Sequence, residues 1–100
     1  MLTLGVNLYN SIYVGDKRFV LTKIYDNENV RLSSDNQDFN IDMDSLIQIG
    51  NGVGAQVCFG VDQGGGFARL NFEGPRTIPI LRSKVYWAQQ EDREVEIGKV

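Results

Sequence analysis

Residues 56–72, QVCFGVDQGGGFARLNF, decide the fold class, because two runs of alternating apolar residues flank a glycine-rich turn. Val57 and Phe59 alternate with other side chains before the turn, and Leu70 and Phe72 do so after it. A period of two is typical of strands with one buried face, and glycines supply the positive φ angles of a long or bulged turn. The stretch therefore predicts a β-hairpin whose apolar face, Phe59 included, lies in the core.

The same alternation recurs along most of the chain. A second hairpin is predicted from Phe19 to Leu32 through the polar turn at 26–29, and Ile12 and Val14 are expected in the core. A helix is predicted to begin near Ser83, a residue type that favours the N-cap, and to continue to about residue 90. Residues 44–47 fit either a single helical turn or the start of a strand. We therefore predict a mainly β fold, a small antiparallel sheet or barrel-like sandwich with one short C-terminal helix.

The length and composition limit the number of domains. The chain has 100 residues, of which 42% are hydrophobic, enough for one core. We expect one β-rich domain over residues 1–92 and a flexible charged tail over 93–100. No apolar run approaches the ~20 residues that cross a bilayer, and residues 1–10 lack the pattern of a signal peptide. A cytoplasmic protein without a membrane partner is the expectation.

Residue types that carry common catalytic chemistry are scarce. The chain has no histidine, and its one cysteine, Cys58, is predicted to be a small buried hydrophobe between apolar neighbours. Asp38, Asp42 and Asp44 bracket apolar positions and are interpreted as the solvated face of a strand, because no calcium-loop spacing surrounds them. We predict a binding module rather than an enzyme, with no cofactor and no metal site.

Charge is unevenly distributed along the chain. Ten Lys and Arg against thirteen Asp and Glu give a net charge of -3, which argues against nucleic-acid binding mainly by counterion release. Acidic side chains concentrate between residues 26 and 44, whereas the C-terminal third contains Arg69, Arg76, Arg82 and Lys84. If a polyanion binds, that third is the expected place.

The two halves of the chain resemble each other in pattern. Residues 11–16, SIYVGD, precede a hairpin that ends in Val30-Arg31-Leu32, and residues 46–51, LIQIGN, precede one that ends in Ala68-Arg69-Leu70. After each Arg-Leu pair, a polar turn leads to another alternating strand. The offset between the halves is not constant, so a degenerate duplication and chance alternation are both open interpretations.

Several segments, taken in order, resemble a known family. Residues 1–4, MLTL, the block 12–16, IYVGD, and Val30-Arg31-Leu32 fall without a gap at the spacing of the carbon storage regulator family, small bacterial proteins that bind messenger-RNA leaders and control translation. Its fourth strand, turn proline, fifth strand and helix start resemble Arg69-Leu70, Gly74-Pro75, Ile78, Ile80, Arg82, Val85 and Tyr86. About half of the chain is covered. The implied fold is an enlarged version of that family's, in which residues 33–67 are an insertion or the second half of a duplication.

The resemblance implies an RNA-binding post-transcriptional regulator, with single-stranded or hairpin-loop RNA as partner. Arg82 corresponds to the family's most important RNA-contacting arginine, whereas Val6 and Asn7 stand where the family typically has two more arginines. Each lost bidentate contact is worth ~1–3 kcal/mol, so weak or altered binding is expected. The candidate RNA-binding residues are Leu4, Arg76, Ile78, Ile80 and Arg82.

A rival function is a protein-interaction or assembly module that kept the fold and lost RNA binding. Members of the family are usually dimers in which the first strand of one protomer lies beside the fifth strand of the other. The strand edge at residues 2–4 therefore predicts a homodimer, with a pseudo-symmetric monomer as the alternative. Some aromatic side chains are candidate platforms for stacked bases, or else ordinary amphipathic sheet residues: Tyr9, Tyr13, Tyr25, Tyr86 and Trp87.

Overall fold

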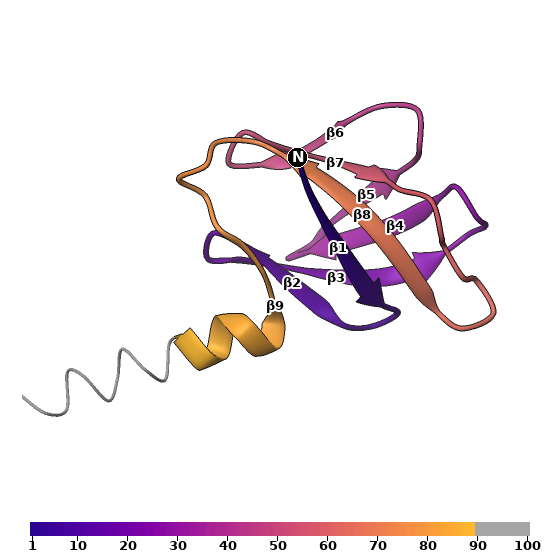
Figure 1. The fold of residues 1–100 in the computed structure, drawn as a ribbon, viewed down its shortest axis with the longest axis horizontal. Helices are drawn as coiled ribbons and strands as arrows, with labels where there is room; N and C mark the ends of the chain where they lie inside the picture. Colours follow the sequence, from indigo (N-terminus) through magenta and orange to yellow (C-terminus); the bar gives the residue numbers. More distant parts are fainter. Residues whose placement is uncertain (90–100) are drawn as a thin grey trace, which may run out of the picture.

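A computed structural model describes residues 1–89. Two antiparallel sheets form this part of the chain, and a short helix over residues 83–89 follows them (Figure 1). No helix within the described residues is long and apolar enough to cross a membrane. The strands are β1 (Leu2–Asn7), β2 (Ser11–Val14), β3 (Lys17–Ile24), β4 (Val30–Ser34), β5 (Gln37–Ile41), β6 (Ile47–Gly50), β7 (Val53–Val57), β8 (Phe67–Glu73) and β9 (Ile80–Arg82). The predicted mainly β fold with one short helix is confirmed.

The strand order follows the same rule in both sheets. The four-stranded sheet has the order β1-β8-β7-β6, and the five-stranded sheet has the order β5-β4-β3-β2-β9. If β1–β4 and β5–β8 are taken as two units, the first strand of each unit pairs with the fourth strand of the other. The segment 33–67 is therefore distributed over both sheets, because it supplies β5 to one and β6 and β7 to the other.

Local geometry repeats between these units as well. The turns at 15–16 and 51–52 each join two strands that pair at the positions flanking the turn, Val14 with Lys17 and Gly50 with Val53. Positive φ angles at Gly15 (62°) and Asn51 (57°) allow both tight turns. The topology is thus pseudo-symmetric within one chain.

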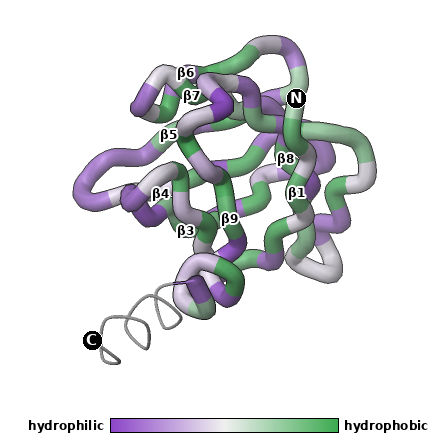
Figure 2. The backbone as a smooth tube through the Cα atoms, turned by 60° about the vertical axis from the view of Figure 1, so that its left-hand side comes forward, coloured by the Kyte–Doolittle hydropathy of each residue, from purple (hydrophilic) through white to green (hydrophobic). Residues whose placement is uncertain are grey.

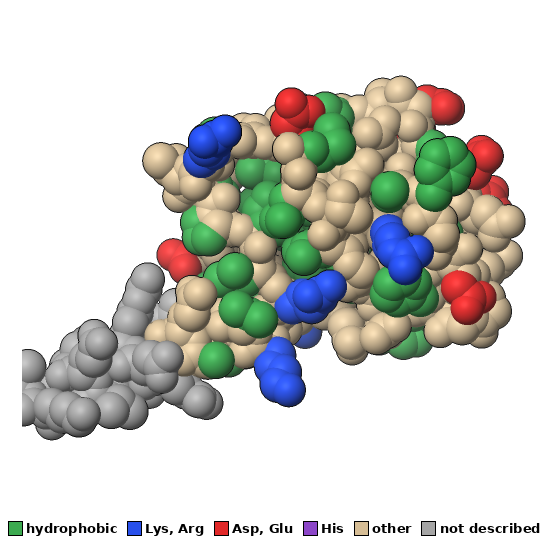
Figure 3. All heavy atoms as spheres, viewed as in Figure 1, with side chains coloured by type: hydrophobic (Ala, Val, Ile, Leu, Met, Phe, Trp, Pro, Cys, Tyr) green, Lys and Arg blue, Asp and Glu red, His purple; other side chains and the backbone are tan. Residues whose placement is uncertain are grey.

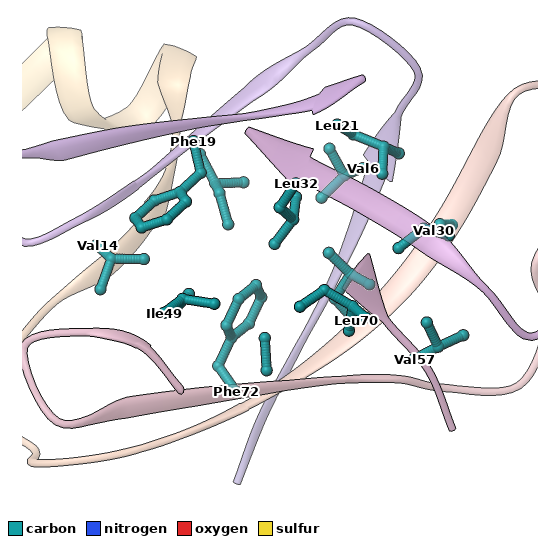
Figure 4. Close-up of a cluster of buried hydrophobic side chains, with 14 of the residues drawn as sticks. Val6, Val14, Phe19, Leu21, Val30, Leu32, Ile49, Val57, Leu70 and Phe72 are labelled. Carbon is teal, nitrogen blue, oxygen red and sulfur yellow. The ribbon is translucent and has the colours of Figure 1, made fainter. Parts of the chain in front are cut away.

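One continuous hydrophobic core joins the two sheets (Figure 4). Alternate residues of each strand point into it, as period-two patterning requires. The largest fully buried side chains are Phe19, Phe72, Ile12, Leu21, Leu32, Ile41, Ile49, Leu70, Val14, Val30 and Val53. Partly buried side chains around these include Leu4, Ile78 and Ile80.

Both predicted hairpins exist, as β3–β4 and β7–β8. Val57, Leu70, Phe72, Ile12 and Val14 are buried as expected. The residues around 44–47 resolve in favour of the strand, since β6 begins at residue 47.

Three expectations about side chains were wrong. Phe59 is 80% exposed, because β7 ends at residue 57 and the backbone turns at Gly60 with a φ of 91°. Cys58 beside it is only partly buried. Asp42 and Asp44 lie in a turn beyond β5 rather than on a strand, and an Asp42 carboxylate oxygen accepts the backbone N–H of Asp44 at 2.9 Å.

The helix at 83–89 begins close to the predicted position and packs on the five-stranded sheet. The rings of Tyr13 in β2 and Tyr86 in the helix stack with centroids 3.8 Å apart, and Trp87 contacts both edge-on. The Tyr86 hydroxyl donates a hydrogen bond to Asp16. These contacts fix the helix beside β9. The predicted charged tail at 93–100 lies outside the described residues.

Candidate functional site

The candidate site lies where the two sheets meet at strands β1 and β9. β1 is an edge of the four-stranded sheet and β9 is an edge of the five-stranded sheet, and Figures 1 and 2 show them as neighbours. No strand pairing joins the two within the described residues. We call the space between them, lined by Leu2–Asn7 on one side and Ile78–Lys84 on the other, the seam.

The backbone of β1 presents polar groups to the seam that no other strand of the described residues pairs with. Arg69 in β8 stands opposite Gly5, and its carbonyl accepts the N–H of Cys58 on the far side of β8. In an antiparallel ladder, backbone groups of successive residues face opposite sides. The N–H and C=O groups of Gly5 and Thr3 therefore point away from β8 and into the seam.

Arg82 bridges the seam. Its Nε–H donates to the carbonyl oxygen of Gly5 at 3.1 Å. The other guanidinium N–H groups can still donate to a ligand, since an arginine side chain has five donors. Arg82 is exposed, so this hydrogen bond is expected to add little to the free energy of unfolding.

A cleft of about 460 Å³ lies at the Arg82 end of the seam. Among residues 1–89, its lining contains two cationic side chains, Arg82 and Lys84, and no carboxylate. Polar side chains, one aromatic ring and the apolar side chains of Val6 and Ile12 complete it. The full lining is Gly5, Val6, Asn7, Tyr9, Asn10, Ser11, Ile12, Arg82, Ser83 and Lys84.

Tyr9 is the most unusual residue in this cleft. Its φ of 69° places a bulky side chain in the left-handed region, which costs ~1–2 kcal/mol for an L-residue. Hydrogen bonds hold the strained loop, since the Tyr9 N–H donates to the Leu21 carbonyl at 2.7 Å and the Leu21 N–H donates to the Asn10 carbonyl. The ring is nevertheless 72% exposed. Strain of this kind concentrates at functional sites, and only the structure showed it here.

A second cleft of about 440 Å³ lies at the other end of the seam. Its lining includes the charged residues Arg76 and Glu73 and the apolar side chains of Leu2, Ile78 and Ile80. Leu2 and Ile80 line the second cleft, and Gly5 and Arg82 line the first. Both strands therefore run from the second cleft to the first, so β1 and β9 point in the same direction.

The structure brings the five predicted site residues to this seam. Arg82 lies in the first cleft, and Arg76, Ile78 and Ile80 lie in the second. Leu4 lies on β1 between the two clefts and packs partly against the core. Figure 3 shows hydrophobic and cationic side chains together on this face of the molecule.

Val6 and Asn7, which stand where the resembling family has arginines, both line the first cleft. Asn7 is exposed, whereas Val6 is only 4% exposed and belongs to the core. An arginine at position 6 of this chain would bury a charge, which is costly without a partner. Only position 7 can accept an added arginine here.

In the pseudo-symmetry of the two units, β5 corresponds to β1, and hydrogen bonds hold the chain beyond β5 to the other sheet. There, β5 and the turn after it contact β6 and β7, the Val57 N–H donates to the Asp42 carbonyl at 2.8 Å, and the Gln56 side chain donates to the Met43 carbonyl. A bond of the same kind holds the loop beside the seam, where the Leu21 N–H of β3 donates to the Asn10 carbonyl after β1 at 3.1 Å, so the loops that follow β1 and β5 are held alike.

Among the described residues, a carboxylate with a shifted pKa lies away from the seam. A lowered pKa is found at Asp26, where the N–H of Glu28 and the side-chain amide of Asn29 hydrogen-bond its carboxylate, and this turn lies between β3 and β4. Within residues 1–89, no three His, Cys, Asp or Glu side chains cluster as a metal site would require. With its cations, an exposed ring and hydrogen-bonding groups, the first cleft is suited to binding an anionic chain that carries aromatic rings and polar edges.

Comparison with protein-family models, curated proteins and solved structures finds no significant match to this chain.

Proposed function

We propose that this chain binds RNA in the seam between β1 and β9 and acts as a post-transcriptional regulator of the kind that the carbon storage regulators represent. The observation that carries the proposal is the first cleft, whose described residues combine two cations, no carboxylate, an exposed strained tyrosine and a strand edge that no other described strand pairs with. The resemblance of the sequence places its key arginine at residue 82, which lies in this cleft.

Each part of the cleft suits one feature of a nucleotide. Arg82 and Lys84 can contact phosphate, as lysine and arginine do in most nucleic-acid complexes. The Tyr9 ring offers a face on which an unpaired base can stack. The N–H and C=O groups of Thr3 and Gly5 can read the edge of a base that has left its helix, which is how proteins recognise RNA loops.

The proposed binding is weak and only mildly dependent on salt. The clefts contain three cations, Arg76, Arg82 and Lys84, in a chain of net charge -3. For single strands the slope of log affinity against log salt is ~0.7 per phosphate neutralised. Two to three contacts therefore give a slope of about -1.4 to -2.1.

The test compares cations inside and outside the seam. The wild type, Arg82→Ala and Arg18→Ala are titrated by fluorescence anisotropy against a purine-rich RNA hairpin at two salt concentrations. Arg18 is exposed in β3 and lies outside both clefts, so its removal changes the net charge equally. We expect Arg82→Ala to weaken binding by ~1–3 kcal/mol and Arg18→Ala to have little effect.

A gain of function completes the test. Asn7→Arg adds a cation at an exposed position of the first cleft and should tighten binding, since each bidentate arginine contact contributes ~1–3 kcal/mol. If neither wild type nor Asn7→Arg binds the hairpin above the level of an unrelated acidic protein, the RNA proposal is wrong.

The second candidate is a protein-interaction module, and the unpaired edges of β1 and β9 favour it. Exposed strand edges pair readily with an extended segment of another chain, which adds main-chain hydrogen bonds. This function takes the place of RNA binding if the titrations fail.

Assembly follows from the same topology. The first strand, β1, pairs with β8 of its own chain, and β9 pairs with β2. Neither sheet needs a second copy to supply a strand, so of the two alternatives we propose the pseudo-symmetric monomer over the homodimer.

A further inference from the structure

The most exposed large hydrophobic side chain within the described residues is Phe59, at 80%. It lies on the loop that joins β7 to β8, directly before Gly60. Phenylalanine gains stability from burial and loses it on exposure, so a ring held in solvent at a defined turn needs an explanation.

Arg69 connects Phe59 to the outer face of the four-stranded sheet. Its guanidinium lies so close to the Gly60 backbone that a Cβ at position 60 would collide with Nη1. The same guanidinium carbon lies 5.3 Å from the ring centroid of Phe67, which is a cation–π contact. Arg69 therefore lies between the two phenylalanines.

Phe67 connects this arrangement to the seam. Its ring tip covers Gly5 so closely that a Cβ at position 5 would lie 2.5 Å from the Phe67 Cζ. The carbonyl of the same Gly5 accepts the hydrogen bond from Arg82. Around Gly5 the surface thus continues from Arg82 to Phe67, then to Arg69 and Phe59, and we call these four side chains the strip.

The sheet surface beside the strip is polar and has two carboxylates at its borders, Glu73 at the end of β8 and Asp62, which pairs with Phe67 in a β-bridge. Outward-facing positions of β1 and β8 alternate with the buried ones, and they include Thr3, Asn7 and Asn71. The Thr3 hydroxyl donates to the Asn71 side-chain oxygen at 2.6 Å.

We infer that the strip is a base-stacking extension of the seam, which carries single-stranded RNA flanking the bound loop across β8 to Phe59. The inference rests on the proposed function. Proteins that hold single strands combine aromatic rings, which stack on bases, with cations that follow the phosphates, and the strip alternates the two. A protein partner would also be attracted to an exposed ring, but the arginine between the two rings favours an anionic chain with aromatic faces.

The test uses two RNA hairpins that share one purine-rich loop, one of which carries a single-stranded purine extension. The proteins are the wild type, Phe59→Leu, Phe67→Leu and Tyr25→Leu, each checked by circular dichroism. Leucine keeps an apolar side chain over Gly5 and removes only the aromatic face. Tyr25 is the matched control, because it is exposed and pairs with Lys23 in a cation–π contact at 5.0 Å on the other sheet.

We expect Phe59→Leu and Phe67→Leu each to weaken binding of the extended RNA by about 5- to 100-fold, because stacking contributes ~1–3 kcal/mol per base and 1.4 kcal/mol is tenfold. Phe59→Leu should not change binding of the short hairpin, and Tyr25→Leu should change neither. Photo-crosslinking of iodinated extension nucleotides to Phe59 or Phe67 supports the strip without relying on affinity.

Three results overturn the inference in different ways. If Arg82→Ala weakens binding of both RNAs while Phe59→Leu and Phe67→Leu bind the extended RNA like the wild type, the strip does not bind RNA and the seam still does. If no variant and no wild type binds either RNA, the proposed function and the strip fail together. Loss of a self-association on Phe59→Leu, without any change in RNA binding, assigns the ring to a protein contact and also overturns it.

Discussion

Phe72→Ala is the substitution that tests the core most directly, and Phe59→Ala is its internal control. Phe72 lies in β8 at 1% exposure and stands opposite Ala55 of β7 and Leu2 of β1. Burial of a phenylalanine side chain contributes ~1.5–3 kcal/mol, and the cavity left by truncation raises the loss to ~3–5 kcal/mol. Phe59 is exposed, so its truncation should change the free energy of unfolding by no more than ~0.5 kcal/mol.

Urea unfolding measured by circular dichroism gives both values. With a denaturant slope of ~1–3 kcal/mol/M, the midpoint of Phe72→Ala should fall by at least ~1 M while that of Phe59→Ala stays in place. If Phe72→Ala does not fold, Phe72→Leu should show a smaller loss in the same direction. Equal destabilisation by Phe59→Ala and Phe72→Ala would show that the Phe59 ring is buried. It would refute the conclusions that β7 ends at residue 57 and that the strip has an exposed ring.

Three further predictions follow from particular contacts. Tyr9→Gly should raise the free energy of unfolding by up to ~1 kcal/mol in thermal melts, because it relieves the left-handed backbone of a tyrosine at some cost in chain entropy. The same variant should weaken RNA binding. A lower free energy of unfolding for Tyr9→Gly would contradict the backbone strain. Hydrogen bonds lower the pKa of Asp26 from 3.8, so the ionised carboxylate stabilises the fold above that pH, and this stabilisation is lost as pH falls through the folded-state pKa. The free energy of unfolding of Asp26→Asn should therefore lack this loss at acid pH. Identical pH profiles of the wild type and Asp26→Asn would exclude the contribution. Light scattering at micromolar concentration should give the mass of one chain, 11.2 kDa, and twice that mass would restore the homodimer.

Much of the local structure could be predicted from the amino-acid sequence, because local structure depends on neighbours along the chain. Alternation of period two predicted the strands of both hairpins, and turn residues such as Gly15 and the cluster at 26–29 predicted where the chain reverses. Ser83 marked the start of the helix for the same reason. An ordered set of short motifs made it possible to predict Arg82, Ile78 and Ile80 as site residues. The order of motifs is a property of the sequence, so this prediction did not need the folded structure.

Strand pairing and the position of the seam depend on the folded chain as a whole. A period of two says which face of a strand is buried, but it does not name the partner strand, so the pairing of β1 with β8 and of β9 with β2 could not be read from it. It also does not say where a strand ends. Phe59 continued the alternation, yet the backbone turns at Gly60 and leaves the ring in solvent. The resemblance to carbon storage regulators predicts an RNA contact at the position of Val6, yet the sandwich buries this side chain, because burial is set by the packing of both sheets together.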